Sequence, residues 1–135
     1  YLQGGYLYIF SARSEKYSLS WLTTPPFIIV FALFFTGFII HVRSDYILRN
    51  LRNPGETGYK VPKGWFFRWI SAPNYFGEMI EWIGWAVLTW SFPGLVFALW
   101  TIFNLLPRAV SHHKWYRETF ENYPEERKAV VPGIL

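Results

Sequence analysis

Residues 41–62, HVRSDYILRNLRNPGETGYKVP, mark an abrupt change from apolar to charged sequence. Residues 17–42 contain no Asp, Glu, Lys or Arg, and a helix needs about 20 apolar residues to cross a bilayer. If that helix continues at about 100° per residue, one face carries a polar stripe of His41, Asp45, Arg49 and Arg52. The Asn-Pro-Gly of residues 53–55 then favours an end to the helix. The simpler alternative is a membrane helix that ends in a solvated charge cluster.

The composition is that of a membrane protein. The chain has 135 residues, of which 52% are hydrophobic and 22% aromatic, well above the usage of soluble domains. A second uncharged run covers residues 82–107. The net charge of +4 comes from basic residues that flank the apolar runs, which is typical of membrane topology and not of a nucleic-acid-binding surface. We therefore predict an all-α fold, a multi-pass transmembrane helix bundle with membrane lipids as neighbours and no nucleic-acid partner.

Proline and glycine residues, which interrupt helices, predict the helix boundaries. We expect helices over residues 21–52, 75–91 and 94–122, with part of a further helix over residues 1–10, so that the chain is a fragment lacking the N-terminal helices of its bundle. The Ser-Phe-Pro-Gly at residues 91–94 can be a kink in one crossing or a turn between two. Both flanking polar segments are rich in Lys and Arg, and cytoplasmic flanks share that property, so we predict a turn with both segments on the same side. Residues 59–75, which mix aromatic and basic side chains, predict an interfacial loop or short helix that anchors the chain or covers a ligand.

Two further polar stripes enter the predicted helices at this end. Asn74, Glu78 and Glu81 share one helical face, and Arg108, Tyr116 and Thr119 lie within about 40° of His112 on another. Ionisable residues at membrane depth indicate function, although mutual salt bridges among Glu78, Glu81 and Arg108 are the structural alternative.

The polar residues of this end suit a nucleotide. Guanidinium and ammonium groups bind phosphate, and four residues offer them: Arg49, Arg52, Lys60 and Arg108. The side chains of Asp45, Asn74 and Glu78 can hold ribose hydroxyls or a carboxamide. The sequence has neither the glycine fingerprint of a Rossmann fold nor a P-loop, so the site would be helical. No metal site is predicted, because neighbours such as His112 and His113 point about 100° apart on a helix.

Three long motifs carry a family resemblance. SDYILRNLRNPGETGYKVP, APNYFGEMIEWIGWAVLTWSFP and PRAVSHHKWYRETFENYPEERKAVVP closely resemble the C-terminal half of the steroid 5-alpha-reductase family. The resemblance implies that residues 1–135 are the membrane-embedded C-terminal domain of an oxidoreductase that uses NADPH to reduce the carbon-carbon double bond of a 3-oxo-4-ene steroid or a similar lipid enone. It also implies an integral membrane location, in the endoplasmic reticulum if eukaryotic or the cytoplasmic membrane if bacterial.

The resemblance implies a cofactor site as well. Matching motifs assign it Asp45, Arg52, Tyr59, Asn74, Glu78, His112 and Tyr116, with Arg52 and Lys60 as candidate phosphate contacts. The sequence departs from the family pattern where His41 replaces an Asn, Lys60 an Arg and Ser111 a His. In the family, a tyrosine and a glutamate of the N-terminal half act at the substrate carbonyl, so the catalytic residues are expected outside this chain. Tyr116 is the candidate acid within it.

Other functions remain open at this point. Enoyl-lipid and sterol reductases have the same broad architecture, and membrane methyltransferases of similar build use S-adenosylmethionine. A lipid-binding protein whose polar stripes are structural salt bridges is the non-enzymatic alternative.

Overall fold

The structure, a computed structural model, describes residues 19–135. Its elements are a short 3₁₀ helix η2 (Leu19–Thr23), helix α2 (Pro25–Arg49), a second 3₁₀ turn η3 (Trp65–Arg68), helix α3 (Pro73–Thr89) and helix α4 (Phe92–Thr119). Over these residues no strand forms, and the only β pairing is an isolated bridge between Ile70 and Lys128. The predicted all-α fold is therefore confirmed. The partial helix expected over residues 1–10 lies outside the described residues.

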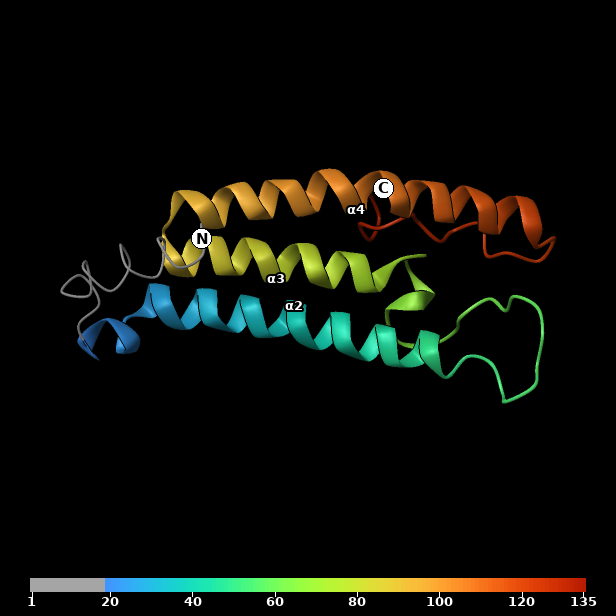
Figure 1. Ribbon diagram of the computed structural model, residues 1–135, viewed down its shortest axis with the longest axis horizontal. Helices are drawn as coiled ribbons and strands as arrows, with labels where there is room; N and C mark the ends of the chain where they lie inside the picture. The colour runs from blue at the N-terminus through green and yellow to red at the C-terminus, as the bar shows by residue number, and fades with distance from the viewer. Residues whose placement is uncertain (1–18) are drawn as a thin grey trace.

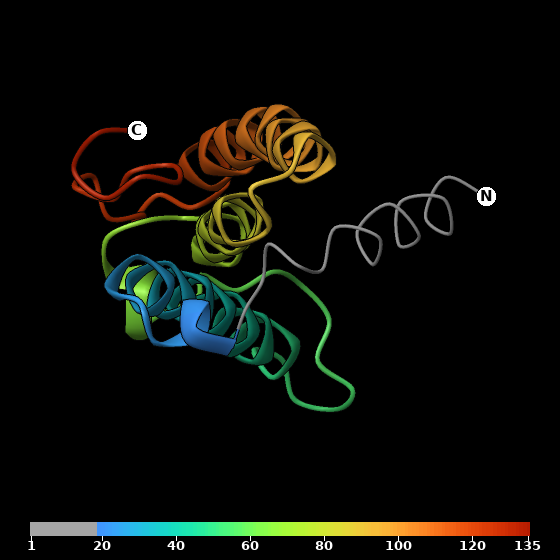
Figure 2. The same ribbon diagram turned by 90° about the vertical axis from the view of Figure 1, so that its left-hand side faces the viewer.

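The three long helices lie side by side in one layer. Helix α3 runs antiparallel to both neighbours and separates α2 from α4 (Figure 1), and the end-on view shows the same order (Figure 2). Only Trp90 and Ser91 connect α3 to α4. Trp90 adopts the left-handed conformation with φ of 43°, and the Ser91 side chain caps α4 by accepting a hydrogen bond from the Gly94 amide at 3.2 Å. The predicted turn, and not a kink, thus joins the last two helices.

The helix ends differ from the predicted ones by a few residues. The first long helix begins at Pro25 because η2 precedes it, and proline suits the first helical turn, where no amide donor is needed. It ends at Arg49, three residues before the predicted end. The Asn50 side chain and its backbone amide both donate to the Tyr46 carbonyl, at 2.8 Å and 3.1 Å. The next amide, that of Leu51, donates to the Leu48 carbonyl at 3.3 Å, three residues back, and so ends the helical pattern. Arg52 therefore lies beyond the helix that was expected to carry it.

Helices α2 and α3 meet at glycines. A Cβ built on Gly77 would lie 2.4 Å from the His41 amide nitrogen and 2.6 Å from the Gly37 carbonyl oxygen. A Cβ on Gly37 would in turn lie 2.5 Å from the Glu81 nitrogen. Small residues allow such backbone contact between membrane helices. The contact places the polar residues of the two helices within hydrogen-bonding reach.

The outer surfaces are apolar. Helices α2 and α4 are long and apolar enough to cross a membrane, with mean hydropathies of 2.1 and 1.4 over an apolar stretch of 18 residues in each. Only 11% of this stretch in α2 and 28% of it in α4 are buried inside the molecule, whereas the core helix of a soluble protein is mostly buried. Large side chains such as Ile29, Phe38, Trp100 and Phe103 are exposed. These surfaces fit the expected membrane bundle, because lipid accepts apolar side chains that water does not.

The C-terminal segment returns along the polar end of α3 and α4 (Figure 1). The Ser71 amide donates to the Lys128 carbonyl at 2.8 Å, and the Ala72 amide to the Ala129 carbonyl at 3.0 Å. Behind these bonds lies a small buried core of residues from three segments: Ala72, Met79, Leu105, Ala109 and Val130. The segment thereby joins α3 to α4 on the side away from α2.

Candidate functional site

The polar residues of all three helices gather at one end of the layer. The C-terminal half of α2, the beginning of α3 and the end of α4 lie there because neighbouring helices are antiparallel (Figure 1). The loop of residues 50–64 and the C-terminal segment cover the same end. The stripes that helical spacing predicts thus share one end of the molecule, although α3 separates the stripe of α2 from that of α4.

Two polar contacts join α2 to α3. The Asn74 amide donates to Asp45 Oδ1 at 3.3 Å, and His41 Nδ1 lies 3.2 Å from Glu81 Oε2. Both pairs are partly buried. Asp45 also accepts from Arg49 at 3.5 Å, one turn along the helix. The first two predicted stripes therefore meet, and an acceptor and an amide lie together at the edge of the bundle.

The alternative set of structural salt bridges does not form. Glu81 pairs with His41 and not with Arg108. Arg108 is exposed on α4, and the described part of the chain gives it no hydrogen-bond or ion-pair partner. Glu78 is partly buried and, within residues 19–135, is likewise without such a partner. Both charges remain available to a ligand.

Helix α4 contributes aromatic side chains. The ring centroids of His112 and Tyr75 lie 5.8 Å apart, so the polar stripe of α4 contacts α3 through His112. Tyr116 is partly buried and stacks on Tyr123 with ring centroids 5.4 Å apart and planes at 9°. The Tyr116 phenol is therefore part of an aromatic wall between α4 and the C-terminal segment.

The loop of residues 50–64 packs against the end of α4. The Arg52 guanidinium lies over the Tyr59 ring, 5.9 Å from its centroid, and Tyr59 meets Trp115 edge to face at 4.9 Å. Arg52 and Tyr59, both predicted cofactor residues, are thus neighbours in space. Both side chains are exposed at the polar end.

Lys60, the other predicted phosphate contact, forms an ion pair with Glu56 within the loop. Glu56 also accepts hydrogen bonds from the Asn53 amide at 2.9 Å and from the Asn53 side chain at 3.1 Å. The bond from Lys60, followed by those from Asn53, lowers the Glu56 pKa from 4.5 to about 2. The carboxylate therefore closes the turn after the Asn-Pro-Gly breaker and holds the Lys60 ammonium near the loop.

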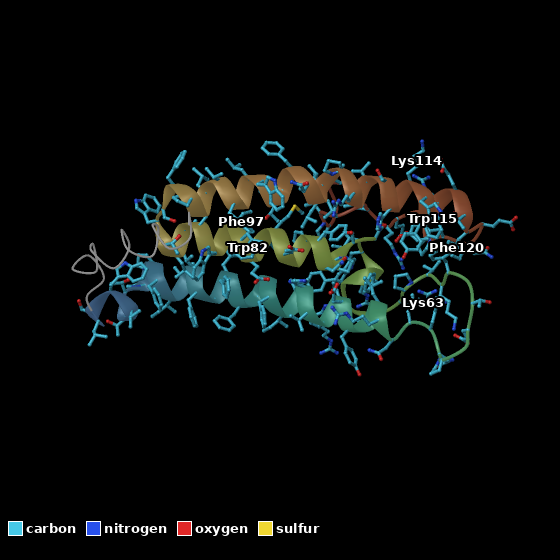
Figure 3. All side chains as sticks on the ribbon, viewed as in Figure 1. Lys63, Trp82, Phe97, Lys114, Trp115 and Phe120 are labelled. Carbon is cyan, nitrogen blue, oxygen red and sulfur yellow. The ribbon has the colours of Figure 1, made fainter. Side chains whose placement is uncertain are left out.

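A basic cavity of about 980 Å³ lies between this loop, η3 and residues 119–127. Its lining includes Tyr59 and Lys60 from the predicted site, and in addition Lys63, Arg68 and Arg127. Glu121 is the acidic residue among its lining. Figure 3 shows Lys63 and Phe120, which both line it, at this end of the molecule. The cavity is a place where an anionic group can bind.

A buried polar cluster stands beside the cavity. The Ser71 hydroxyl lies 2.6 Å from His113 Nδ1 and 2.6 Å from the Tyr123 hydroxyl, and it donates to the Lys128 carbonyl at 3.1 Å. Arg127 donates to the Tyr123 hydroxyl at 3.4 Å. Thus His113 faces Ser71 and Tyr123, while its neighbour His112 faces Tyr75.

Comparison with known proteins identifies the family. A profile of the 3-oxo-5-alpha-steroid 4-dehydrogenase family matches residues 1–135. The chain belongs to the 3-oxo-5-alpha-steroid 4-dehydrogenase family. The relative named 3-oxo-5-alpha-steroid 4-dehydrogenase 1 from Rattus norvegicus is 51% identical over 135 residues, which are 100% of this chain and 51% of the relative.

Two human relatives give the same result. The Homo sapiens protein named 3-oxo-5-alpha-steroid 4-dehydrogenase 1 is 48% identical over 100% of this chain and 51% of its own length. The protein named 3-oxo-5-alpha-steroid 4-dehydrogenase 2 is 47% identical over 99% and 51%. The chain spans about half the length of the curated 3-oxo-5-alpha-steroid 4-dehydrogenases it matches.

Helical spacing did not reveal every polar residue at the site of this 3-oxo-5-alpha-steroid 4-dehydrogenase family member. Ser71, Tyr123 and Arg127 were missed because they lie in irregular segments, where no period relates a residue to a face. The available signal was the run RKAVVP, in which two basic residues precede a short apolar segment that ends at a proline. Only the return of the C-terminal segment brings that arginine to the cavity.

Proposed function

We propose that this chain is part of an integral membrane oxidoreductase that uses NADPH to reduce the carbon-carbon double bond of a 3-oxo-4-ene steroid or a similar lipid enone. In this proposal the chain carries mainly the cofactor site. The observation that carries it is that the Asp45–Asn74 pair and a large basic cavity lie at the same end of a membrane bundle. The names of the relatives support a steroid substrate.

The donor set fits a phosphorylated dinucleotide. Arg52 and Lys60 would bind phosphate, and the exposed Arg108 would add a further positive charge. Asp45, Asn74 and Glu78 can accept or donate bonds to ribose hydroxyls and a carboxamide. The rings of Tyr59, His112 and Tyr116 offer flat surfaces against which a planar base can pack. No glycine-rich fingerprint is required, because side chains and not a helix N-terminus would hold the phosphates.

The residues of this chain would bind, orient and shield, while NADPH would supply the hydride. Reduction of an enone also needs a polarised carbonyl oxygen and a proton at the neighbouring carbon. Tyr116 is half-buried against Tyr123, which favours a role as a wall of the cofactor site over that of proton donor. Apolar packing of α3 against α4 would keep water from the reacting atoms.

The test is NADPH oxidation by the complete protein of which this chain is part, reconstituted in liposomes and measured with a panel of steroid enones and enoyl lipids. We expect turnover with 3-oxo-4-ene steroids. Turnover with enoyl lipids alone would overturn the steroid assignment. Saturable binding of S-adenosylmethionine in place of NADPH would indicate a methyltransferase, and binding of lipid without either cofactor would indicate a non-enzymatic role.

A further inference from the structure

The cavity between residues 59–64, η3 and residues 119–127 has an unbalanced charge. Four cationic side chains line it: Lys60, Lys63, Arg68 and Arg127. Glu121 is its acidic lining residue, and it forms no ion pair with any residue from 19 to 135. Lys60 is held by Glu56. The other three cations have no carboxylate partner within this range.

Arg127 is the most informative of these residues because it is buried. Only 4% of its surface is exposed. Its guanidinium donates one long hydrogen bond, to the Tyr123 hydroxyl at 3.4 Å, and lies 4.9 Å from the centre of that ring. Its Nε has no hydrogen-bond partner in the described structure. Burial of an arginine is costly unless an opposite charge accepts its hydrogen bonds, so an anion is expected beside it.

We propose that this cavity is a phosphate-binding site in which Lys63, Arg68 and Arg127 hold the ligand. The planar guanidinium of arginine matches the oxygen geometry of phosphate, and a lysine adds a mobile positive charge. A cavity of about 980 Å³ is larger than a phosphate, so the phosphate belongs to a larger organic molecule. Two sources have this chemistry: a phosphorylated cofactor and the headgroup of an anionic lipid.

The site goes beyond the residues assigned to the cofactor. It shares Tyr59 and Lys60 with them, but its three phosphate-binding side chains come from the loop before η3, the last residue of η3 and the C-terminal segment. The basis is the charge balance of the cavity and the buried Arg127. It therefore stands or falls independently of the proposed reductase activity.

Titration of inorganic pyrophosphate tests the site, with the protein in nanodiscs of neutral lipid and binding followed by calorimetry. Lys63→Gln and Arg68→Gln should each weaken binding roughly five- to tenfold, because each removes a charge-assisted contact that is partly exposed. Glu121→Gln should strengthen binding. Arg127→Lys keeps the charge and loses the planar donor, so it should also weaken binding. A thermal scan of each variant separates loss of the site from loss of the fold.

The matched control is Lys114→Gln. Lys114 pairs with Glu118 at 3.7 Å and points outward from α4, whereas Lys63 and Phe120 lie at the cavity (Figure 3). The substitution removes the same charge and should leave pyrophosphate affinity within about twofold. If Lys114→Gln weakens binding as much as Lys63→Gln and Arg68→Gln, or if the unsubstituted protein shows no saturable binding, the site does not exist.

Two further arms distinguish the sources of the phosphate. If a phosphorylated cofactor supplies it, Lys63→Gln and Arg68→Gln will weaken NADPH binding. NADH, which lacks one phosphate, will be unaffected if the site holds that phosphate and equally weakened if the site holds the pyrophosphate that both cofactors share. If a lipid supplies it, nanodiscs that contain phosphatidic acid will compete with pyrophosphate, and the two variants will bind NADPH normally. Either result supports the site. Pyrophosphate binding without any NADPH binding would contradict the proposed function and leave the phosphate-binding site supported.

Discussion

At the scale of single residues, Arg52 tests how the phosphates of the cofactor are held. Arg52→Ala should weaken NADPH more than NADH if the guanidinium binds the 2′-phosphate, as arginine does in other NADP sites. Losing a charge-assisted contact costs roughly 1.5–3 kcal/mol, about ten- to a hundredfold in affinity. Fluorescence titration of both cofactors measures the difference, with Lys114→Ala as the control. Equal weakening of NADPH and NADH would place Arg52 at the shared pyrophosphate.

A second prediction at this scale concerns the acid stability of the loop. The folded pKa of Glu56 is lowered from 4.5 to about 2 by Lys60 and Asn53. Its carboxylate therefore stabilises the closed loop fully above about pH 4.5, and that contribution is lost as the pH falls through about 2. Carbon-13 NMR of the Glu56 carboxyl should give a midpoint near pH 2. A midpoint near 4.5 would mean that the loop is open in solution.

Glu56→Gln offers an independent check of the same contact. It removes the partner of Lys60, so amide hydrogen exchange across residues 50–60 should become faster at neutral pH. Glu118→Gln, which breaks the exposed pair with Lys114 on α4, should leave exchange in the loop unchanged.

At the scale of elements, the contact between α2 and α3 depends on Gly77. A methyl group there would meet the His41 nitrogen and the Gly37 carbonyl oxygen, both backbone atoms that cannot move aside. Gly77→Ala should therefore force the helices apart and lower the free energy of unfolding by about 1–3 kcal/mol. It should also weaken NADPH, since Asp45 and Asn74 would separate. Thermal unfolding in detergent measures the first effect.

Val96→Leu is the control for Gly77→Ala. It adds a methylene to an exposed side chain on α4, where lipid can accommodate it, and should leave the unfolding temperature unchanged. A Gly77→Ala protein as stable as the parent would show that the two helices have room to separate without cost.

At the scale of the whole molecule, the hairpin of α3 and α4 predicts a topology in the membrane. The protein has no cysteine, so single cysteines can be introduced at Thr57 and at Glu125, both exposed. They should react with a membrane-impermeant thiol reagent from the same side of sealed vesicles. A cysteine at Phe92, exposed at the far end beside the turn, should react from the other side. Labelling of Thr57 and Glu125 from opposite sides would rule out a site that the two segments share.

Local sequence was enough to predict the helices, the turn between the last two, and the end of the molecule where polar residues gather. Apolar length, proline and glycine act within one or two turns of the chain, so their effect does not depend on distant partners. The pair of Asp45 and Asn74 joins two of the predicted stripes, but helical spacing did not predict which members of the stripes would bond. The end of α2 was misplaced by three residues because the Leu51 amide donates to the Leu48 carbonyl, three and not four residues back, and hydrophobic periodicity does not register such a change.

Tertiary structure alone decided which surfaces meet. The contact of Gly37 with Gly77 depends on the crossing point of two helices, and a glycine in sequence does not show which backbone will approach it. Ser71 bonds with His113, Tyr123 and Lys128, all more than 40 residues away along the chain. Arg127 reaches the cavity only because the C-terminal segment returns to α3. Contacts between residues so far apart in the sequence depend on the packing of the whole chain. The polar end was therefore predictable from the sequence, while the phosphate-binding cavity was not.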